Sequence, residues 1–265
     1  AGDEHEQANY FHKVYFHRLG TAQSEDVLVY ERPDQKEWGF AASVTEDGVY
    51  LVLSVWKGTS QKNGVFYRDL RADGDVVELL SDFDADYTFV GNDGPVFFFR
   101  TDLDAPRGRL IAIDTLAPAR SNWKQIVPER EDVMQSVNLT AEHFVVNSMH
   151  DAHDRIELFT LDGAFVRAVD LPSLGSVGGF GGRRDATDTF YSFTSFLYPT
   201  VVYRYDFTTG RSEVFRQPEL AFDFYAYTTE QVFYTSKDGT RVPMFLIHRE
   251  DVELDGDNPT LLYGY

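Results

Sequence analysis

Short apolar runs rich in strand-forming residues recur through the middle of the chain and predict β-strands. The clearest stretches are Val49–Val55, Pro95–Arg100, His143–Ser148 and Thr189–Phe196. Each is followed by a second apolar run, and these runs lead to Asp69, Asp114, Asp162 and Asp206. The four aspartates recur at intervals of roughly 45 residues, which indicates a weak internal repeat built from strands.

Acidic turns precede three of the four stretches. They are Glu46-Asp47-Gly48, Asn92-Asp93-Gly94 and Arg184-Asp185-Ala186-Thr187-Asp188. Several short antiparallel strands in a repeat of roughly 40–50 residues are typical of a β-propeller blade. We therefore predict an all-β fold, a partial β-propeller of about four blades between Ser43 and Glu219, with a fragment of another blade at Lys13–Arg32. No long segment has helical periodicity, which disfavours an alternating strand–helix fold.

The pattern changes after the last blade. Val232–Tyr234 and Val242–Ile247 are apolar strand-like runs, and Ser236–Thr240 between them has Asp-Gly at its tip, which predicts a hairpin. Thr260–Tyr263 begins a third run of this kind, followed only by Gly264 and Tyr265. Because a buried strand needs neighbours for its backbone groups, we expect this chain to be a piece of a longer protein.

Composition and charge narrow the classes of function. Hydrophobic residues make up 43% and aromatic residues 15% of the chain, which is enough for a packed core. The net charge of −19 disfavours binding to nucleic acid or to an anionic membrane, since phosphates would be repelled. We interpret the acidity as a source of solubility, with steering of cationic substrates as the alternative. No apolar run approaches the roughly 20 residues that span a bilayer.

The chain has no cysteine, which excludes disulfides, thiolate nucleophiles and thiolate metal ligands. The absence of cysteine does not distinguish the cytoplasm from the periplasm. We expect a cytoplasmic protein, with the periplasm left open.

Two acidic clusters contain metal-ligating residue types. His150-Asp151-Ala152-His153-Asp154 has His and Asp at short spacing, as in transition-metal sites, but it falls where one strand must turn into the next. Asp82-Phe83-Asp84-Ala85-Asp86 alternates like a calcium loop but lacks the Gly and the later Glu of that loop. We interpret both as polar turns and predict no metal site.

Several segments resemble the prolyl oligopeptidase family of serine peptidases. His12–Glu31 resembles the family's strand–turn–strand with LGT-x-QSED at its turn, and Gly181–Asp206 resembles the blade with the FYxFTSFLxP signature. The SKDGT, VPMF and LLYGY segments near the C-terminus resemble the junction where the propeller passes into an α/β-hydrolase domain. Together they cover essentially the whole chain, in the right order.

The resemblance implies a division of the chain and an activity. Residues 1–222 would be the later blades of a seven-bladed propeller, and residues 223–265 the first strands of the hydrolase domain. The parent enzyme would be a monomeric serine endopeptidase without a cofactor that cleaves short peptides after proline. The Ser, Asp and His of the catalytic triad follow later in such chains, so the isolated segment is expected to be inactive. Consistently, the glycine-rich stretch Gly175–Gly182 lacks the Gly-x-Ser-x-Gly pattern of a nucleophile elbow.

The resemblance also implies three site residues. Tyr265 matches the second Tyr of the YGYGGF motif, whose hydroxyl donates to the oxyanion of the tetrahedral intermediate. Trp56 and Thr59 stand where some members carry an Arg and a Cys that face the substrate. An arginine contact to peptide carbonyls is therefore absent from this position, and Trp56 either stacks on the substrate or packs within its own loop.

Two other functions compete with this interpretation. A free-standing propeller would bind protein or peptide partners without catalysis, but it has no use for hydrolase-type strands after its last blade. An oligopeptidase of the same superfamily that cleaves after basic residues would suit the acidic charge. The LGT-x-QSED and FTSFL segments favour the proline-specific branch.

Overall fold

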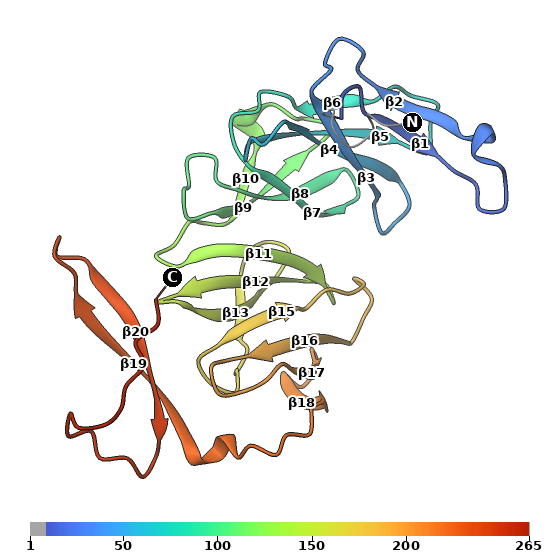
Figure 1. Cartoon of the computed structure of the whole chain (residues 1–265). Coiled ribbons are helices and arrows are strands. Elements are labelled where there is room, and N and C mark those ends of the chain that lie inside the picture. The colour runs from blue at the N-terminus through green and yellow to red at the C-terminus, as the bar shows by residue number, and fades with distance from the viewer. Residues whose placement is uncertain (1–8, 265) are drawn as a thin grey trace, which may run out of the picture.

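Four sheets, each of four antiparallel strands, follow one another along the chain (Figure 1). The computed structural model describes residues 9–264. The first blade consists of β3 (Trp38–Val44), β4 (Tyr50–Lys57), β5 (Asn63–Asp69) and β6 (Val77–Leu80). The second consists of β7 (Tyr87–Asp93), β8 (Val96–Thr101), β9 (Arg109–Asp114) and β10 (Lys124–Val127). The third consists of β11 (Val133–Thr140), β12 (His143–His150), β13 (His153–Phe159) and β14 (Phe165–Ala168). The fourth consists of β15 (Ser176–Gly179), β16 (Asp188–Thr194), β17 (Val201–Asp206) and β18 (Arg211–Arg216).

The prediction of an all-β fold with four propeller-like blades is confirmed. The helical elements among residues 9–264 are three short 3-10 turns, at Gln23–Glu25 (η1), Arg120–Asn122 (η2) and Phe224–Ala226 (η3). The blades form an arc, and within the described range no strand of the first blade pairs with a strand of the fourth. Among these residues, no helix has the length and apolar character needed to cross a membrane.

The cores lie between neighbouring blades, because apolar side chains on the facing sides of adjacent sheets pack together. Successive phenylalanines in β8 illustrate this arrangement. Phe97 and Phe99 join a buried cluster shared with the first blade, while Phe98 joins the cluster shared with the third. Side chains alternate across a strand, so one strand supplies two cores. A third cluster, with Val145, Phe180 and Tyr205 among its members, joins the third and fourth blades.

The repeated aspartates hold the turn between the third and fourth strands of each blade. Asp69, Asp114 and Asp206 are the last residues of their strands, and each accepts a hydrogen bond from a backbone N–H two or three residues later. Asp162 does not share that position, because β13 ends at Phe159 and Asp162 lies within the turn itself. The repeat indicated by the four aspartates therefore holds in the structure for three of them and fails for Asp162.

Two hairpins flank the four blades. β1 (Lys13–Phe16) and β2 (Val27–Glu31) form a two-stranded sheet beside the first blade, where the fragment of another blade was predicted. β19 (Tyr227–Thr235) and β20 (Arg241–Arg249) form the predicted C-terminal hairpin around Ser236–Thr240. The strand predicted at Thr260–Tyr263 is not formed: no described strand pairs with this segment, and Leu261, Leu262 and Tyr263 are highly exposed.

Candidate functional site

The turns of the four blades gather at two opposite ends of the propeller. Turns between first and second strands lie at one end, and turns between second and third strands lie at the other, because successive strands are antiparallel. The hairpin β19–β20 lies at the second end (Figure 1). There the Gln231 side chain donates a hydrogen bond to the carbonyl of Asp151, Arg241 lies 3.7 Å from the Asp151 carboxylate, and the rings of Phe196 and Phe245 are 5.4 Å apart.

Trp56 and Thr59 lie at the same end as this hairpin. Trp56 is the penultimate residue of β4, and Thr59 is exposed in the turn that follows. The half-buried Trp56 ring covers Gly39 on β3, where a Cβ would come within 2.2 Å of the indole, and His12 meets the ring edge-on at 6.1 Å. Gly39 thus provides the space in which the indole packs, while the predicted substrate contact of Trp56 and Thr59 stays a prediction.

Tyr265, the predicted oxyanion donor, lies outside the described residues.

The histidine–aspartate cluster forms the turn between β12 and β13. His150 Nδ1 lies 2.6 Å from Asp132, which also accepts a hydrogen bond from Arg155 at 3.0 Å. The His150 and His153 rings meet edge-on at 5.4 Å. Burial lowers the pKa of His153 below its ordinary value, opposed in part by a hydrogen bond with the Asp151 backbone. These contacts fit the prediction of a polar turn.

The acidic segment at positions 82–86 is likewise occupied by protein partners. The Arg120 guanidinium bonds to both Asp82 and Asp84, and the Tyr87 hydroxyl donates to Asp84 at 2.8 Å. Despite the cost of burial, these hydrogen bonds lower the pKa of Asp84. Within residues 9–264, no three His, Cys, Asp or Glu side chains are grouped so that they could hold a metal ion.

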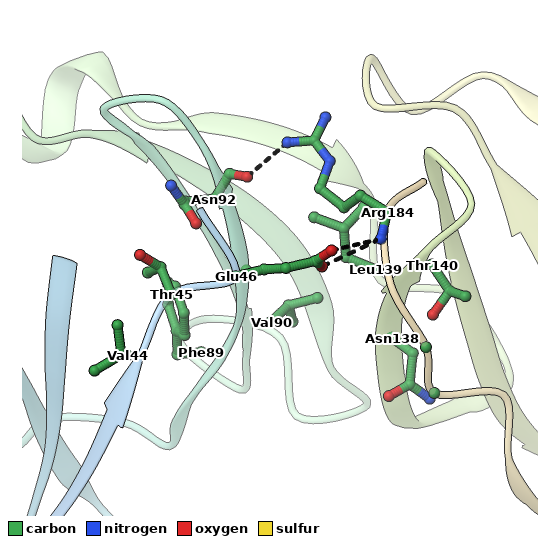
Figure 2. Close-up of a pocket in the computed structure, with 13 residues that line it drawn as sticks. Val44, Thr45, Glu46, Phe89, Val90, Asn92, Asn138, Leu139, Thr140 and Arg184 are labelled. Atoms are coloured by element: carbon green, nitrogen blue, oxygen red, sulfur yellow. Dashed lines mark hydrogen bonds between the residues drawn. The ribbon is translucent and has the colours of Figure 1, made fainter. Parts of the chain in front are cut away.

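A cavity of about 250 Å³, shown in Figure 2, lies among the turns between first and second strands. This is the end of the propeller opposite the hairpin. All four blades contribute to its lining: the end of β3 with its turn, β7, β11, and the segment after β15. First strands face the axis of a propeller, and we call this opening between the four blades, on the axial side of the arc, the mouth. Its lining residues are Val44, Thr45, Glu46, Phe89, Val90, Gly91, Asn92, Asn138, Leu139, Thr140, Gly181, Gly182 and Arg184.

Arg184 joins its own blade to the other three at this mouth. Its backbone N–H lies 3.1 Å from both carboxylate oxygens of Glu46 in the first blade. Its guanidinium donates to the carbonyl of Asn92 at 2.9 Å and to Asp93 at 3.2 Å in the second blade. The same guanidinium binds both carboxylate oxygens of Glu142 in the third blade, with Nε at 3.0 Å from Oε1. We call Glu46, Asn92, Asp93, Glu142 and Arg184 the Arg184 network.

The local backbone holds Glu142 in a constrained position. Ala141 and Glu142 form the two-residue turn between β11 and β12 with φ angles of 52° and 57°, a left-handed conformation that costs free energy for residues with a Cβ. The Ala141 N–H donates to the carbonyl of Arg183 at 3.1 Å, which ties this turn to the fourth blade. The hydrogen bond to Glu142 is the largest contribution that raises the pKa of Arg184, and burial opposes it.

The turns that carry Glu46, Asp93 and Arg184 were predicted from the sequence, but the network that joins them was not. The sequence does contain a pattern that could have indicated the network. Glu46, Asp93 and Arg184 each lie in one of the three acidic turns that precede the second strand of a blade. Equivalent turns of successive blades lie at the same end of a propeller, so residues distant in sequence come together there.

The four blades and the hairpin that follows them define a β-propeller domain. The family described as "Prolyl oligopeptidase, N-terminal beta-propeller domain" matches residues 1–218. The chain belongs to the prolyl oligopeptidase family.

Relatives and solved structures agree with this assignment. The chain is similar to a prolyl endopeptidase of Elizabethkingia meningoseptica, with 37% identity over 96% of this chain and 36% of the relative. It is 31% identical to the dual function macrocyclase-peptidase POPB of Galerina marginata, over 94% of this chain and 36% of that protein. A solved structure of prolyl oligopeptidase B from Galerina marginata superimposes with a TM-score of 0.83 at 29% identity, covering 91% of this chain and 35% of that one. The chain thus spans about a third of the length of these relatives.

Proposed function

We propose that this chain is the propeller portion of a serine endopeptidase that cleaves short peptides after proline. Residues 1–222 supply the propeller, and residues 223–265 supply the first strands of the hydrolase domain. The observation that carries the proposal is the match to named prolyl endopeptidases over 96% of this chain and only 36% of their length. The nucleophile, its Asp and its His belong to the remaining part of the enzyme, so the isolated chain is inactive.

The propeller restricts access in this proposal. A ring of blades over the active site leaves a narrow route, so short flexible peptides reach the nucleophile and folded proteins do not. Trp56 and Thr59 contact the substrate from the end of the propeller that carries the hairpin. The Tyr265 hydroxyl stabilises the oxyanion in the complete enzyme. The enzyme works as a monomer in the cytoplasm, without a cofactor.

The test compares the complete protein with the isolated chain. The substrate is a reporter ester or amide that carries Gly-Pro, and the control reporter carries Ala in place of Pro. We expect the complete protein to cleave the proline reporter, to lose this activity to a serine-directed phosphonate, and to leave the alanine reporter nearly intact. The isolated chain is expected to show background hydrolysis only.

Two outcomes would contradict the proposal. A complete protein without peptidase activity would favour a propeller that binds partners without catalysis. Phosphonate-sensitive turnover by the isolated chain would place the nucleophile within these 265 residues.

A further inference from the structure

The turn between β12 and β13 is where the third blade meets the hairpin β19–β20 (Figure 1). The side chain of Gln231, on β19, donates a hydrogen bond to the backbone carbonyl of Asp151 in this turn. Arg241, on β20, lies 3.7 Å from the Asp151 carboxylate. Both strands of the hairpin therefore contact the same residue of the propeller.

The backbone of this turn has a defined and costly conformation. Asp151 and Ala152 have φ angles of 45° and 65°, the left-handed region that is unfavourable for a residue with a Cβ. Asp-Gly is a preferred pair for such a two-residue turn, so Ala152 occupies a position that favours glycine. Asp132 accepts hydrogen bonds from His150 at 2.6 Å and from Arg155 at 3.0 Å, which ties together the two strands that carry the turn. The Asp151 carbonyl is therefore held in one direction by the blade.

The hydrogen bond from Gln231 matters more than the ion pair. The Arg241 side chain is 63% exposed, and exposed ion pairs contribute little to stability. Its guanidinium also lies over the ring of Phe233, within its own hairpin. The Gln231 bond is partly buried, and its acceptor is a backbone atom that cannot move without the turn.

We propose that the Asp151 carbonyl fixes the hairpin to the third blade, and that Gln231 is thereby a positioning residue for peptide cleavage. This rests on the proposed function, in which the hairpin is the first part of the hydrolase domain. Without the bond, the hairpin retains the contact of Phe245 with Phe196 of the fourth blade and tilts about it. A peptide that touches both the propeller and the hydrolase domain is then held less accurately against the nucleophile, and such a misplacement lowers the rate.

Two control variants separate this role from the stability of the surrounding structure. Gln231→Met removes the donor and keeps the length of the side chain. Glu230→Met changes the preceding residue of β19, whose carboxylate lies 3.8 Å from His248 of the same hairpin. Ala152→Gly relieves the left-handed backbone of the turn and leaves both the Asp151 carbonyl and Gln231 in place.

The first experiment measures kcat in the complete protein for a proline-containing peptide. The number of active sites is counted by titration with a serine-directed phosphonate. We expect Gln231→Met to lower kcat per titrated site several-fold, while Glu230→Met and Ala152→Gly keep the value of the unsubstituted protein. A variant that was merely partly unfolded would lose titratable sites and keep its kcat per site, which would overturn the proposal. An unsubstituted protein without any titratable site would instead contradict the proposed function.

The second experiment is hydrogen exchange, which does not require activity. We expect Gln231→Met, but not Glu230→Met, to accelerate exchange at residues 150–153 and in the hairpin, and Ala152→Gly to slow exchange at residues 150–153. Unchanged exchange in Gln231→Met would show that its bond does not fix the hairpin. Faster exchange with an unchanged kcat per site would overturn the positioning role. Should Gln231→Met fail to fold, Gln231→Glu removes the donor at the same side-chain length, and the same comparisons apply to it.

Discussion

His153 is a histidine whose charge is disfavoured by its surroundings in the folded protein. It begins β13 opposite His150, and burial lowers its pKa, with His150 and Arg155 acting in the same direction. An unfolded histidine has an ordinary pKa near 6.5, so the unfolded chain binds this proton more readily. The stability that neutral His153 contributes is therefore fully present above that pH and is lost as pH falls toward the lower folded pKa.

This linkage predicts a specific effect of substitution. Replacing His153 by Gln removes the titrating group, so the fall in melting temperature between about pH 7 and pH 5 should be shallower in His153→Gln than in the unsubstituted protein. Thermal unfolding followed by circular dichroism across this range checks the prediction. An identical slope in the two proteins would assign the acid sensitivity to other groups.

At the scale of elements, one recurring contact joins each of two blades to the next. Asn63 at the start of β5 donates its N–H to the carbonyl of Ala85 and accepts the N–H of Tyr87 on its side-chain oxygen at 2.7 Å. Asp154 in β13 does the same with Gly175 and Val177, also at 2.7 Å. In both cases a side chain on the third strand of one blade accepts a hydrogen bond from a backbone N–H in the first strand of the next blade.

We predict that Asp154→Ala destabilises the junction of the third and fourth blades. The substitution leaves the Val177 N–H without this acceptor, which costs about 1–3 kcal/mol when a buried partner is lost. Asp154→Asn keeps an acceptor oxygen and should cost less. Hydrogen exchange at the Val177 amide, together with the unfolding midpoint, measures both variants. Equal effects of Ala and Asn would mean that the charge of Asp154, rather than its hydrogen bond, is what matters.

Strand positions were predictable because burial on two faces leaves a local pattern. The continuous apolar run in Val96–Thr101 and the Asp-Gly turn at Ser236–Thr240 each depend on neighbouring residues only. The position of Asp162 was not predictable in this way, because the end of β13 is set by its pairing with β12 and β14 rather than by the aspartate. The strand predicted at Thr260–Tyr263 does not form, and pairing is again the reason. An apolar run becomes a strand only where another strand lies beside it and pairs with its backbone.

At the scale of the whole molecule, the contacts of the site residues could not be predicted from local sequence patterns, because they join segments that lie far apart in the chain. Glu46 and Arg184 are 138 residues apart, and only the arrangement of four blades brings them together. The packing of Trp56 likewise depends on Gly39 in the neighbouring strand, which in the sequence is an ordinary strand glycine. The family's motifs nevertheless led from the sequence to the correct family, because they report ancestry rather than local physics.

The proposed contribution of Tyr265 spans the two domains of the complete enzyme. If its hydroxyl stabilises the oxyanion, Tyr265→Phe should lower kcat by about 10²–10³, the usual cost of removing one such donor. KM should change little, because the ring is retained and the interaction belongs to the transition state. Steady-state kinetics on a substrate limited by chemistry tests this.

The comparison substrate is one whose turnover is limited by product release, for which the loss should be smaller. An unchanged kcat on the chemistry-limited substrate would remove the role, and a raised KM alone would make Tyr265 a ground-state contact.

The turns between third and fourth strands differ in length from blade to blade, spanning residues 70–76, 115–123, 160–164 and 207–210, while the strands on either side stay paired. Changes in chain length are thus absorbed at the rim of the propeller, away from the channel. Because the chain contains no cysteine, a single Leu116→Cys substitution in the second of these turns, where the side chain is 80% exposed, creates a unique attachment point for a fluorescent dye. Dyes placed in this way on two different blades would measure, by energy transfer, whether the blades move apart while a peptide is being processed.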